Sequence, residues 1–161
     1  MKKVLIIYGL LVVGIIIIAV LRFRGINLLP TIGDFGGGSA TATIENDKFD
    51  IEVADEDKER VKGLSERKNL AEDKGMVFVF EKKGKYGFWM RNVNFPLDII
   101  YISDDTIVDI IKNAEPKALD ATDIPIYEPK QEANYVLEIN GGLSDKLEIQ
   151  IGDKVKFDGI K

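Results

Sequence analysis

The chain contains no cysteine and no histidine among its 161 residues. Without cysteine it can form no disulfide, use no thiol nucleophile and build no thiolate metal site. Without histidine it lacks the commonest general base and the commonest metal ligand, which excludes a Ser-His-Asp triad and a zinc or copper site of the usual type. Residues 55–66 resemble a calcium loop in their acidic spacing, but Arg60 stands where that loop requires glycine. We therefore expect no metal and no cofactor.

Basic residues are in deficit over most of the chain. The formal net charge is −5, but Lys2, Lys3, Arg22 and Arg24 all precede residue 25. The remaining residues, 25–161, hold 18 basic and 27 acidic side chains, a charge of −9. A body this acidic repels phosphate backbones, so we expect no nucleic-acid partner.

Residues 4–21, VLIIYGLLVVGIIIIAVL, form a run of 18 residues without a charge. A helix of this length, at about 1.5 Å per residue, roughly crosses a bilayer. The alternative is a cleaved signal peptide, whose apolar region is usually about 7–15 residues long and ends in small residues. This run ends AVLR. The sequence therefore favours an uncleaved, single-pass anchor over residues 1–24, which places the protein in the cell membrane.

Residues 25–39 contain Pro30, Gly33 and the run GGGS, which is the composition of a flexible linker. A phosphate-binding loop is not indicated, because no Gly-Lys-Ser/Thr follows these glycines. We therefore divide the chain into an anchor at residues 1–24, a linker at residues 25–39 and a globular domain at residues 40–161.

Short β-rich runs separated by turn signals dominate the globular domain. Asp55 is a suitable N-cap for a short helix ending near Lys62, and residues 113–133, with three prolines, indicate a long irregular loop. The pattern predicts a mainly β (α+β) fold, a small antiparallel barrel or sandwich with one or two short helices. Strands are expected over residues 40–46, 48–54, 76–81, 86–91, 97–103, 106–112, 134–140 and 154–157, with hairpin turns at Lys83-Gly84 and Asp104-Asp105.

Charged residues interrupt two of the apolar strands. The segment FWMRNVNFPLDII (residues 88–100) contains Asp98 on a strand whose two faces are both apolar, as expected of a strand covered on both sides. Glu138 stands in the same setting in NYVLEIN. A buried carboxylate is costly unless it is paired or hydrogen-bonded. We therefore expect Arg91 to pair with Asp98 or Glu138, and Asn92 to bond the backbone at a bend.

Two interpretations of these residues remain open. In the first, the charged network only closes one end of a barrel. In the second, an open pocket for a sugar or another polar small molecule is lined by Trp89, Arg91, Asn92, Asp98 and Glu138. A stricter version of the second makes Asp98 and Glu138 the acid–base pair of a hydrolase acting on glycans.

Several spaced segments resemble the conserved family known as "domain of unknown function 192": GLSERKNLAEDKGMVFVFE, YGFWMRNVNFPLDIIYI, VDIIKNAEP, YVLEINGG and IGDKV. The resemblance covers roughly residues 40–157, and its most specific patterns fall on residues 75–76, 89–92, 96–98 and 137–141. Family members are small bacterial and archaeal proteins, often with a signal peptide or an N-terminal anchor. The resemblance implies a compact β-rich domain and no established activity.

Two basic residues flank residues 4–21 on each side, Lys2 and Lys3 before them and Arg22 and Arg24 after them, so the charges support both membrane orientations almost equally. The family resemblance favours a domain outside the cytoplasm. We therefore expect a membrane-tethered, extracytoplasmic domain that binds a small polar ligand or an envelope protein without catalysis. The alternatives are a carboxylate-dependent hydrolase acting on glycans and a structural accessory subunit of a membrane complex.

Overall fold

A computed structural model of the chain describes residues 40–160. The anchor and linker expected from the sequence lie outside these residues. Within residues 40–160, no helix is both long enough and apolar enough to cross a membrane. The elements, in chain order, are β1 (Ala40–Ile44), β2 (Asp47–Ala54), α2 (Asp57–Lys62), β3 (Lys74–Gly84), β4 (Leu97–Ser103), β5 (Thr106–Ala114), β6 (Ala133–Asn140), α3 (Leu143–Lys146) and β7 (Val155–Asp158).

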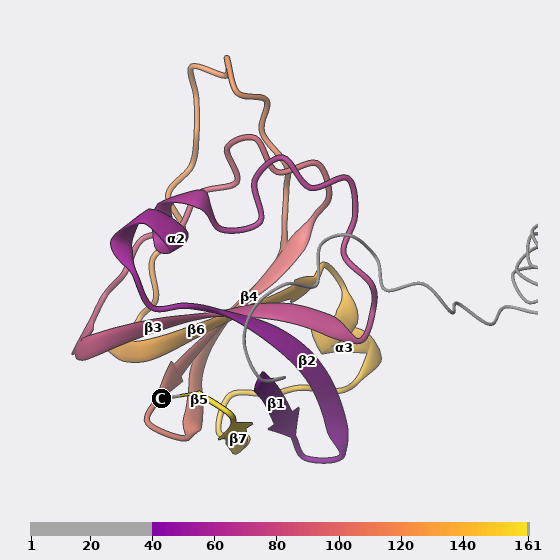
Figure 1. Cartoon of the computed structure of the whole chain (residues 1–161), viewed down its shortest axis with the longest axis vertical. Coiled ribbons are helices and arrows are strands. Elements are labelled where there is room, and N and C mark those ends of the chain that lie inside the picture. The colour runs from indigo at the N-terminus through magenta and orange to yellow at the C-terminus, as the bar shows by residue number, and fades with distance from the viewer. Residues whose placement is uncertain (1–39, 161) are drawn as a thin grey trace, which may run out of the picture. The chain divides into compact units, whose positions relative to one another are not determined.

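The strands form one curled sheet in the order β5-β4-β6-β3-β2-β1-β7 (Figure 1). All neighbouring pairs are antiparallel except β2 and β3, which run parallel. The expectation of a purely antiparallel sheet is therefore wrong. Parallel strands cannot be joined by a tight hairpin, and α2 with the loop after it supplies the crossover that returns the chain to the same end of the sheet.

Helix α2 begins one residue later than expected. Its N-cap is Glu56 rather than Asp55, and the main-chain N–H of Glu56 donates to the Glu59 carboxylate at 3.3 Å. The helix ends at Lys62, as predicted, because Gly63 adopts φ +47°, in the left-handed region that glycine enters at little cost.

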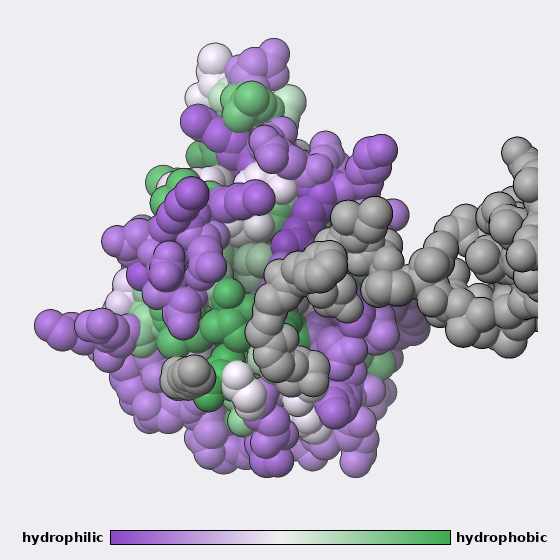
Figure 2. Space-filling view, in the orientation of Figure 1, coloured by the Kyte–Doolittle hydropathy of each residue, from purple (hydrophilic) through white to green (hydrophobic). Residues whose placement is uncertain are grey.

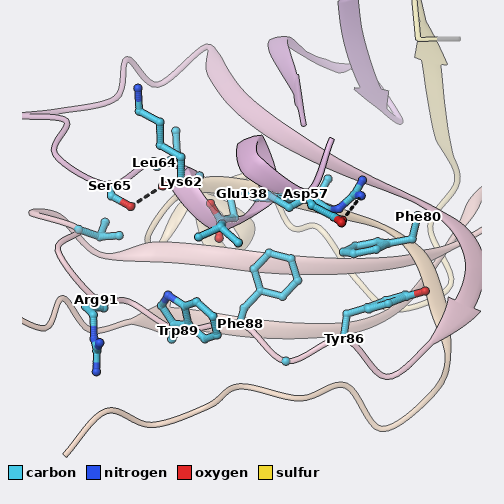
Figure 3. Close-up of a pocket in the computed structure, with 16 residues that line it drawn as sticks. Asp57, Lys62, Leu64, Ser65, Phe80, Tyr86, Phe88, Trp89, Arg91 and Glu138 are labelled. Atoms are coloured by element: carbon cyan, nitrogen blue, oxygen red, sulfur yellow. Dashed lines mark hydrogen bonds and ion pairs between the residues drawn. The ribbon is translucent and has the colours of Figure 1, made fainter. Parts of the chain in front are cut away.

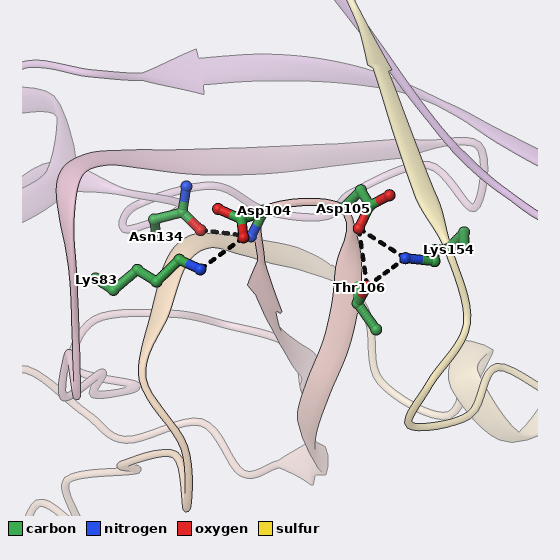
Figure 4. A network of polar contacts seen from close by, with 6 residues as sticks. All are labelled: Lys83, Asp104, Asp105, Thr106, Asn134 and Lys154. Atoms are coloured by element: carbon green, nitrogen blue, oxygen red, sulfur yellow. Dashed lines mark hydrogen bonds and ion pairs between the residues drawn. The ribbon is translucent and has the colours of Figure 1, made fainter.

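The two edges of the sheet meet at the turn between β4 and β5 (Figure 4). The Val155 N–H donates to the Asp105 carbonyl at 2.8 Å, and Thr106 forms a bridge with Lys154. Lys154 also pairs with the Asp105 carboxylate, and Lys83 pairs with Asp104. These ion pairs are exposed and contribute little stability, so the backbone bonds are the main link between the edges. The sheet is therefore curled into a half-barrel whose edge strands, β5 and β7, approach each other at this turn.

Two apolar clusters cover opposite faces of this sheet. One draws residues from all seven strands and from α3, and therefore fills the inside of the curl. The other lies on the outer face, between the central strands and the segments that cover them, residues 64–70 and 88–95. Strand β4 contributes to both, and six of its seven residues are buried. This confirms the prediction from its two apolar faces.

Residues 86–91 do not form the expected strand of the sheet, and Lys83-Gly84 is not the turn of a hairpin. Instead β3 continues to Gly84, and the following segment makes only isolated bridges, at Phe88 with Tyr127 and at Arg91 with Lys117. The segment covers the outer face of the sheet because it buries Met90 completely there. The last strand is Val155–Asp158, one residue later than expected.

Candidate ligand pocket around Glu138

A cavity of about 430 Å³ lies between the outer face of the sheet, helix α2 with the turn after it, and residues 86–93 (Figure 3). The surface over α2 is mostly hydrophilic, while hydrophobic residues gather over the strands next to the helix (Figure 2). The cavity is lined by Asp57, Arg60, Val61, Lys62, Gly63, Leu64, Ser65, Phe78, Phe80, Tyr86, Gly87, Phe88, Trp89, Arg91, Val93 and Glu138.

Aromatic rings make up much of the cavity wall. Phe80 and Tyr86 stack with their ring centres 3.6 Å apart, and the Arg60 guanidinium lies 5.4 Å from the centre of the Phe80 ring. Phe88 meets Phe78 edge to face at 4.8 Å. Such packing fixes the rings in place, so the wall is formed before any ligand arrives.

Two apolar side chains are exposed where the cavity opens. Trp89 is 48% exposed and Val61 is 67% exposed, and both line the cavity. A large aromatic residue is costly to leave in water, and tryptophan is enriched where proteins contact ligands and partners. Trp89 was singled out from the sequence, and the structure places it at this opening.

Glu138 is the only buried acidic residue among those that line the cavity. It lies on β6 opposite Met76 of β3 and Ile99 of β4, and is only 5% exposed. Burial raises the pKa of its carboxyl from 4.5 to about 8, although the positive charge of Arg67 acts in the opposite direction. At neutral pH the group is therefore mostly protonated and can donate a hydrogen bond.

No hydrogen bond or ion pair joins the Glu138 carboxyl to another group within residues 40–160. The nearby Arg67 is held elsewhere, because its guanidinium forms a two-pronged ion pair with Glu52. The Glu138 carboxyl thus enters the cavity as a polar group that other parts of the described chain leave open. The carboxyl oxygens are not among the fully enclosed atoms without a partner, so water in the cavity reaches them. A ligand atom that accepts the hydrogen bond of Glu138 would take the place of that water.

Asp98 is fully buried but does not reach this cavity. Its carboxylate accepts three backbone N–H bonds, from Asn113 at 2.7 Å, Gly142 at 3.0 Å and Ser144 at 2.7 Å. These bonds join β5 and the start of α3 to β4. The expectation that Arg91 neutralises Asp98 is wrong, because backbone donors satisfy the carboxylate instead.

The sheet register also separates Asp98 from Glu138. Asp98 stands opposite Ile139, and Glu138 stands opposite Ile99. Because successive side chains of a strand point to opposite faces, Asp98 projects into the inside of the curl and Glu138 projects to the outer face. The two carboxyls cannot act together on one bond, so the hypothesis that Asp98 and Glu138 form the acid–base pair of a hydrolase is wrong.

Arg91 and Asn92 also take places that the sequence did not predict fully. Arg91 is exposed and lines the cavity, with its charged end pointing away from Glu138 (Figure 3). Asn92 provides the expected bend, with φ +59°, and its main chain bonds to Lys117 and Glu66. Its side chain does not line the cavity. Trp89, Arg91 and Glu138 are thus brought together, while Asn92 and Asp98 support the fold around them.

Sequence reasoning missed the opposite wall of the cavity, formed by α2 and the end of β3. Only two weak features of the sequence indicate this wall. Val61 is an apolar residue in an otherwise charged helix, and Phe80 and Tyr86 flank a lysine-rich segment. No group of three potential metal ligands gathers in the part of the chain that the structure describes.

These features define a class of protein, a mainly β half-barrel with a ring-lined cavity and a buried carboxyl on its outer face. The chain belongs to the DUF192 family, whose model, described as "Uncharacterized ACR", matches residues 40–157. The resemblance seen in the sequence is therefore confirmed. No curated protein matches the chain.

Two solved structures share this fold. One is a protein of unknown function from Novosphingobium aromaticivorans, with 34% sequence identity and a TM-score of 0.68, over 80% of this chain and 90% of that one. The other, from Sinorhizobium meliloti, is described provisionally as a transcription regulator, with 28% identity and a TM-score of 0.68, over 80% of this chain and all of that one.

Proposed function

We propose that the globular domain binds a small organic ligand in the cavity beneath Trp89. The ligand would have an apolar, ring-containing body that lies against Phe88 and Trp89, and a polar atom that accepts a hydrogen bond from Glu138. The Glu138 carboxyl carries this proposal, because a buried acid that faces an aromatic cavity without a partner has no packing role. The neutral acid and the aromatic wall support a ligand less polar than the sugar considered from the sequence.

The proposal is tested by NMR titration with neutral ring compounds such as 2-naphthamide. Trp89 is the single tryptophan, so its indole N–H gives one assignable signal at the cavity mouth. Binding should shift this signal, with dissociation constants on the order of 0.1–1 mM for ligands of about a dozen heavy atoms.

Two variants distinguish binding in the cavity from nonspecific binding to exposed apolar residues elsewhere on the surface. Trp89→Ala should weaken binding severalfold, as measured by calorimetry. Leu119→Ala removes a residue that is 65% exposed but lies outside the cavity, and should leave binding unchanged. Equal effects of the two substitutions, or no binding of any ring compound, would contradict the proposal.

We further propose that residues 4–21 hold the domain at the outer side of the cell membrane, where a ligand or a partner protein of the envelope would reach the cavity. The support is the uncharged run of 18 residues without a small-residue cleavage site. Alkaline carbonate extraction followed by N-terminal sequencing should find the intact chain in the membrane fraction. A soluble form beginning after Ala19 would contradict the anchor.

A further inference from the structure

We propose that the ligand of this pocket is an organic acid, whose ring body enters the cavity with a polar atom at Glu138 and whose anionic group stays at the solvent-facing mouth, attracted by the charges of Lys62 and Arg91. The inference rests on the proposed function, since it assigns a ligand class to the same cavity. It is drawn from the charged groups around the cavity, which differ in sign from the rest of the domain.

The cavity lining is positively charged although the domain is acidic. Residues 25–161 carry a formal charge of −9, yet the charged residues that line the cavity are Arg60, Lys62 and Arg91 against Asp57 and the mostly neutral Glu138. A cationic mouth in an acidic body concentrates anions locally and repels cations.

The cations of the lining differ in whether they are already paired. Arg60 is held by the Asp57 carboxylate at 2.6 Å and also donates to the Val79 carbonyl at 2.8 Å. Lys62 and Arg91 form no ion pair within residues 40–160. Both are exposed, so their charges are available to a ligand.

The positions of Lys62 and Arg91 fit a group held at the mouth rather than in the interior. They lie at opposite sides of the residues around Glu138 and Phe88, with their charged ends directed away from the rings (Figure 3). Because these charged ends also point away from each other, the acid group of a ligand would stay at the solvent-facing rim, attracted by both charges without being clamped by them, while its body displaces water from the aromatic wall.

A cationic ligand is disfavoured for two reasons. It would approach unpaired cations at the mouth, and inside it would meet a carboxyl that burial keeps mostly protonated at neutral pH. An uncharged ligand fits the interior but makes no use of Lys62 and Arg91. An organic acid that carries a second polar atom on its ring body satisfies both parts of the site.

The test compares three probes of similar shape by calorimetry at pH 7: the 2-carboxylate (naphthoate), the 2-carboxamide (naphthamide) and the 2-methylammonium derivative of 6-methoxynaphthalene. In each, the methoxy oxygen can accept from Glu138. The domain of residues 40–161 is used, because the family model matches residues 40–157 and one solved structure is matched over its whole length. The anion should bind several times more tightly than the amide, and the ammonium should bind most weakly. The advantage of the anion should shrink as salt rises from about 20 to 500 mM, since exposed charges are screened.

Charge reversal then assigns the effect to the two cations. In Lys62→Glu/Arg91→Glu the affinity for naphthoate should fall roughly tenfold or more, because two attractive exposed charges become repulsive, while naphthamide binding should change little. Lys58→Glu is the matched control, because Lys58 lies on the same helix but not in the cavity lining. Lys62→Gln/Arg91→Gln provides a milder double variant if the reversed one unfolds.

The outcomes separate this inference from the proposed function. Equal binding of naphthoate and naphthamide would overturn the organic-acid inference and leave the pocket intact, and so would the same loss of naphthoate affinity in Lys58→Glu. Tightest binding of the ammonium would also overturn it and make Glu138 a counter-ion. Failure of all three probes to bind would overturn both proposals.

Discussion

Replacing Glu138 with glutamine should make the domain more stable at high pH and leave it nearly unchanged at low pH. The folded domain holds the Glu138 proton up to a pKa of about 8, whereas the unfolded chain releases it near 4.5. Between these values only the folded state binds the proton, so the free energy of unfolding falls as pH rises. Glutamine has nearly the same shape but no titrating proton, so the variant lacks this loss.

The size of the effect follows from the two pKa values. Each unit corresponds to about 1.4 kcal/mol, so the wild-type domain should lose about 3 kcal/mol by pH 7 and about 5 kcal/mol above pH 8. This is a large part of the roughly 5–15 kcal/mol that stabilises a typical domain. Burial justifies the full conversion, because Glu138 is only 5% exposed.

Urea unfolding of the domain at intervals between pH 4 and 9 measures the effect. The difference between Glu138→Gln and the wild type should open progressively from about pH 4.5 to 8, while other titrating groups cancel. Glu81→Gln, at an exposed position of β3, should follow the wild-type curve. Parallel curves for Glu138→Gln and the wild type over this window would show that folding does not raise the pKa of Glu138.

Three further substitutions test the supports around the pocket. Asp98→Ala should cost about 3–5 kcal/mol in unfolding free energy, because it leaves three backbone N–H groups without their acceptor; Asp105→Ala at the exposed turn should show no comparable loss. Arg91→Met should change the unfolding free energy by less than about 0.5 kcal/mol and add independently to Asp98→Ala in a double-mutant cycle, whereas strong coupling would restore the rejected ion pair. Gly75→Ala should lower the melting temperature markedly, because a Cβ there would lie 2.8 Å from the Glu138 carbonyl oxygen; an unchanged melting temperature would show that β3 and β6 can separate at this point.

The fold could be predicted in its elements but not in its connections. Apolar alternation and turn residues located most strands, since these are local signals. The parallel pairing of β2 with β3 could not be foreseen, because six residues of charged helix give no sign that they serve as a crossover. Residues 86–91 have strand-like composition, yet they cover the sheet instead of extending it, and only tertiary packing of Met90 decides between the two.

The candidate site was predicted in part for the same reason. Apolar neighbours correctly marked Asp98 and Glu138 as buried, because burial follows from the faces of a strand. Their partners did not follow, since the donors to Asp98 are backbone groups, which have no signature in a sequence. Arg91 was expected to pair with Asp98 or Glu138 because charge alone suggested a pair, but it pairs with neither. The register places the two carboxyls on opposite faces of the sheet, and the charged end of Arg91 points away from Glu138.

The most direct test of the account is a carbon-detected NMR titration of the Glu138 side-chain carboxyl, with and without 2-naphthamide. We predict a pKa of about 8 for this carboxyl in the free domain, and a change in its chemical shift at neutral pH when the ligand is added. A pKa near 4.5 together with no response to the ligand would show that Glu138 is an ordinary solvated acid, and that the cavity beneath Trp89 is not a ligand site.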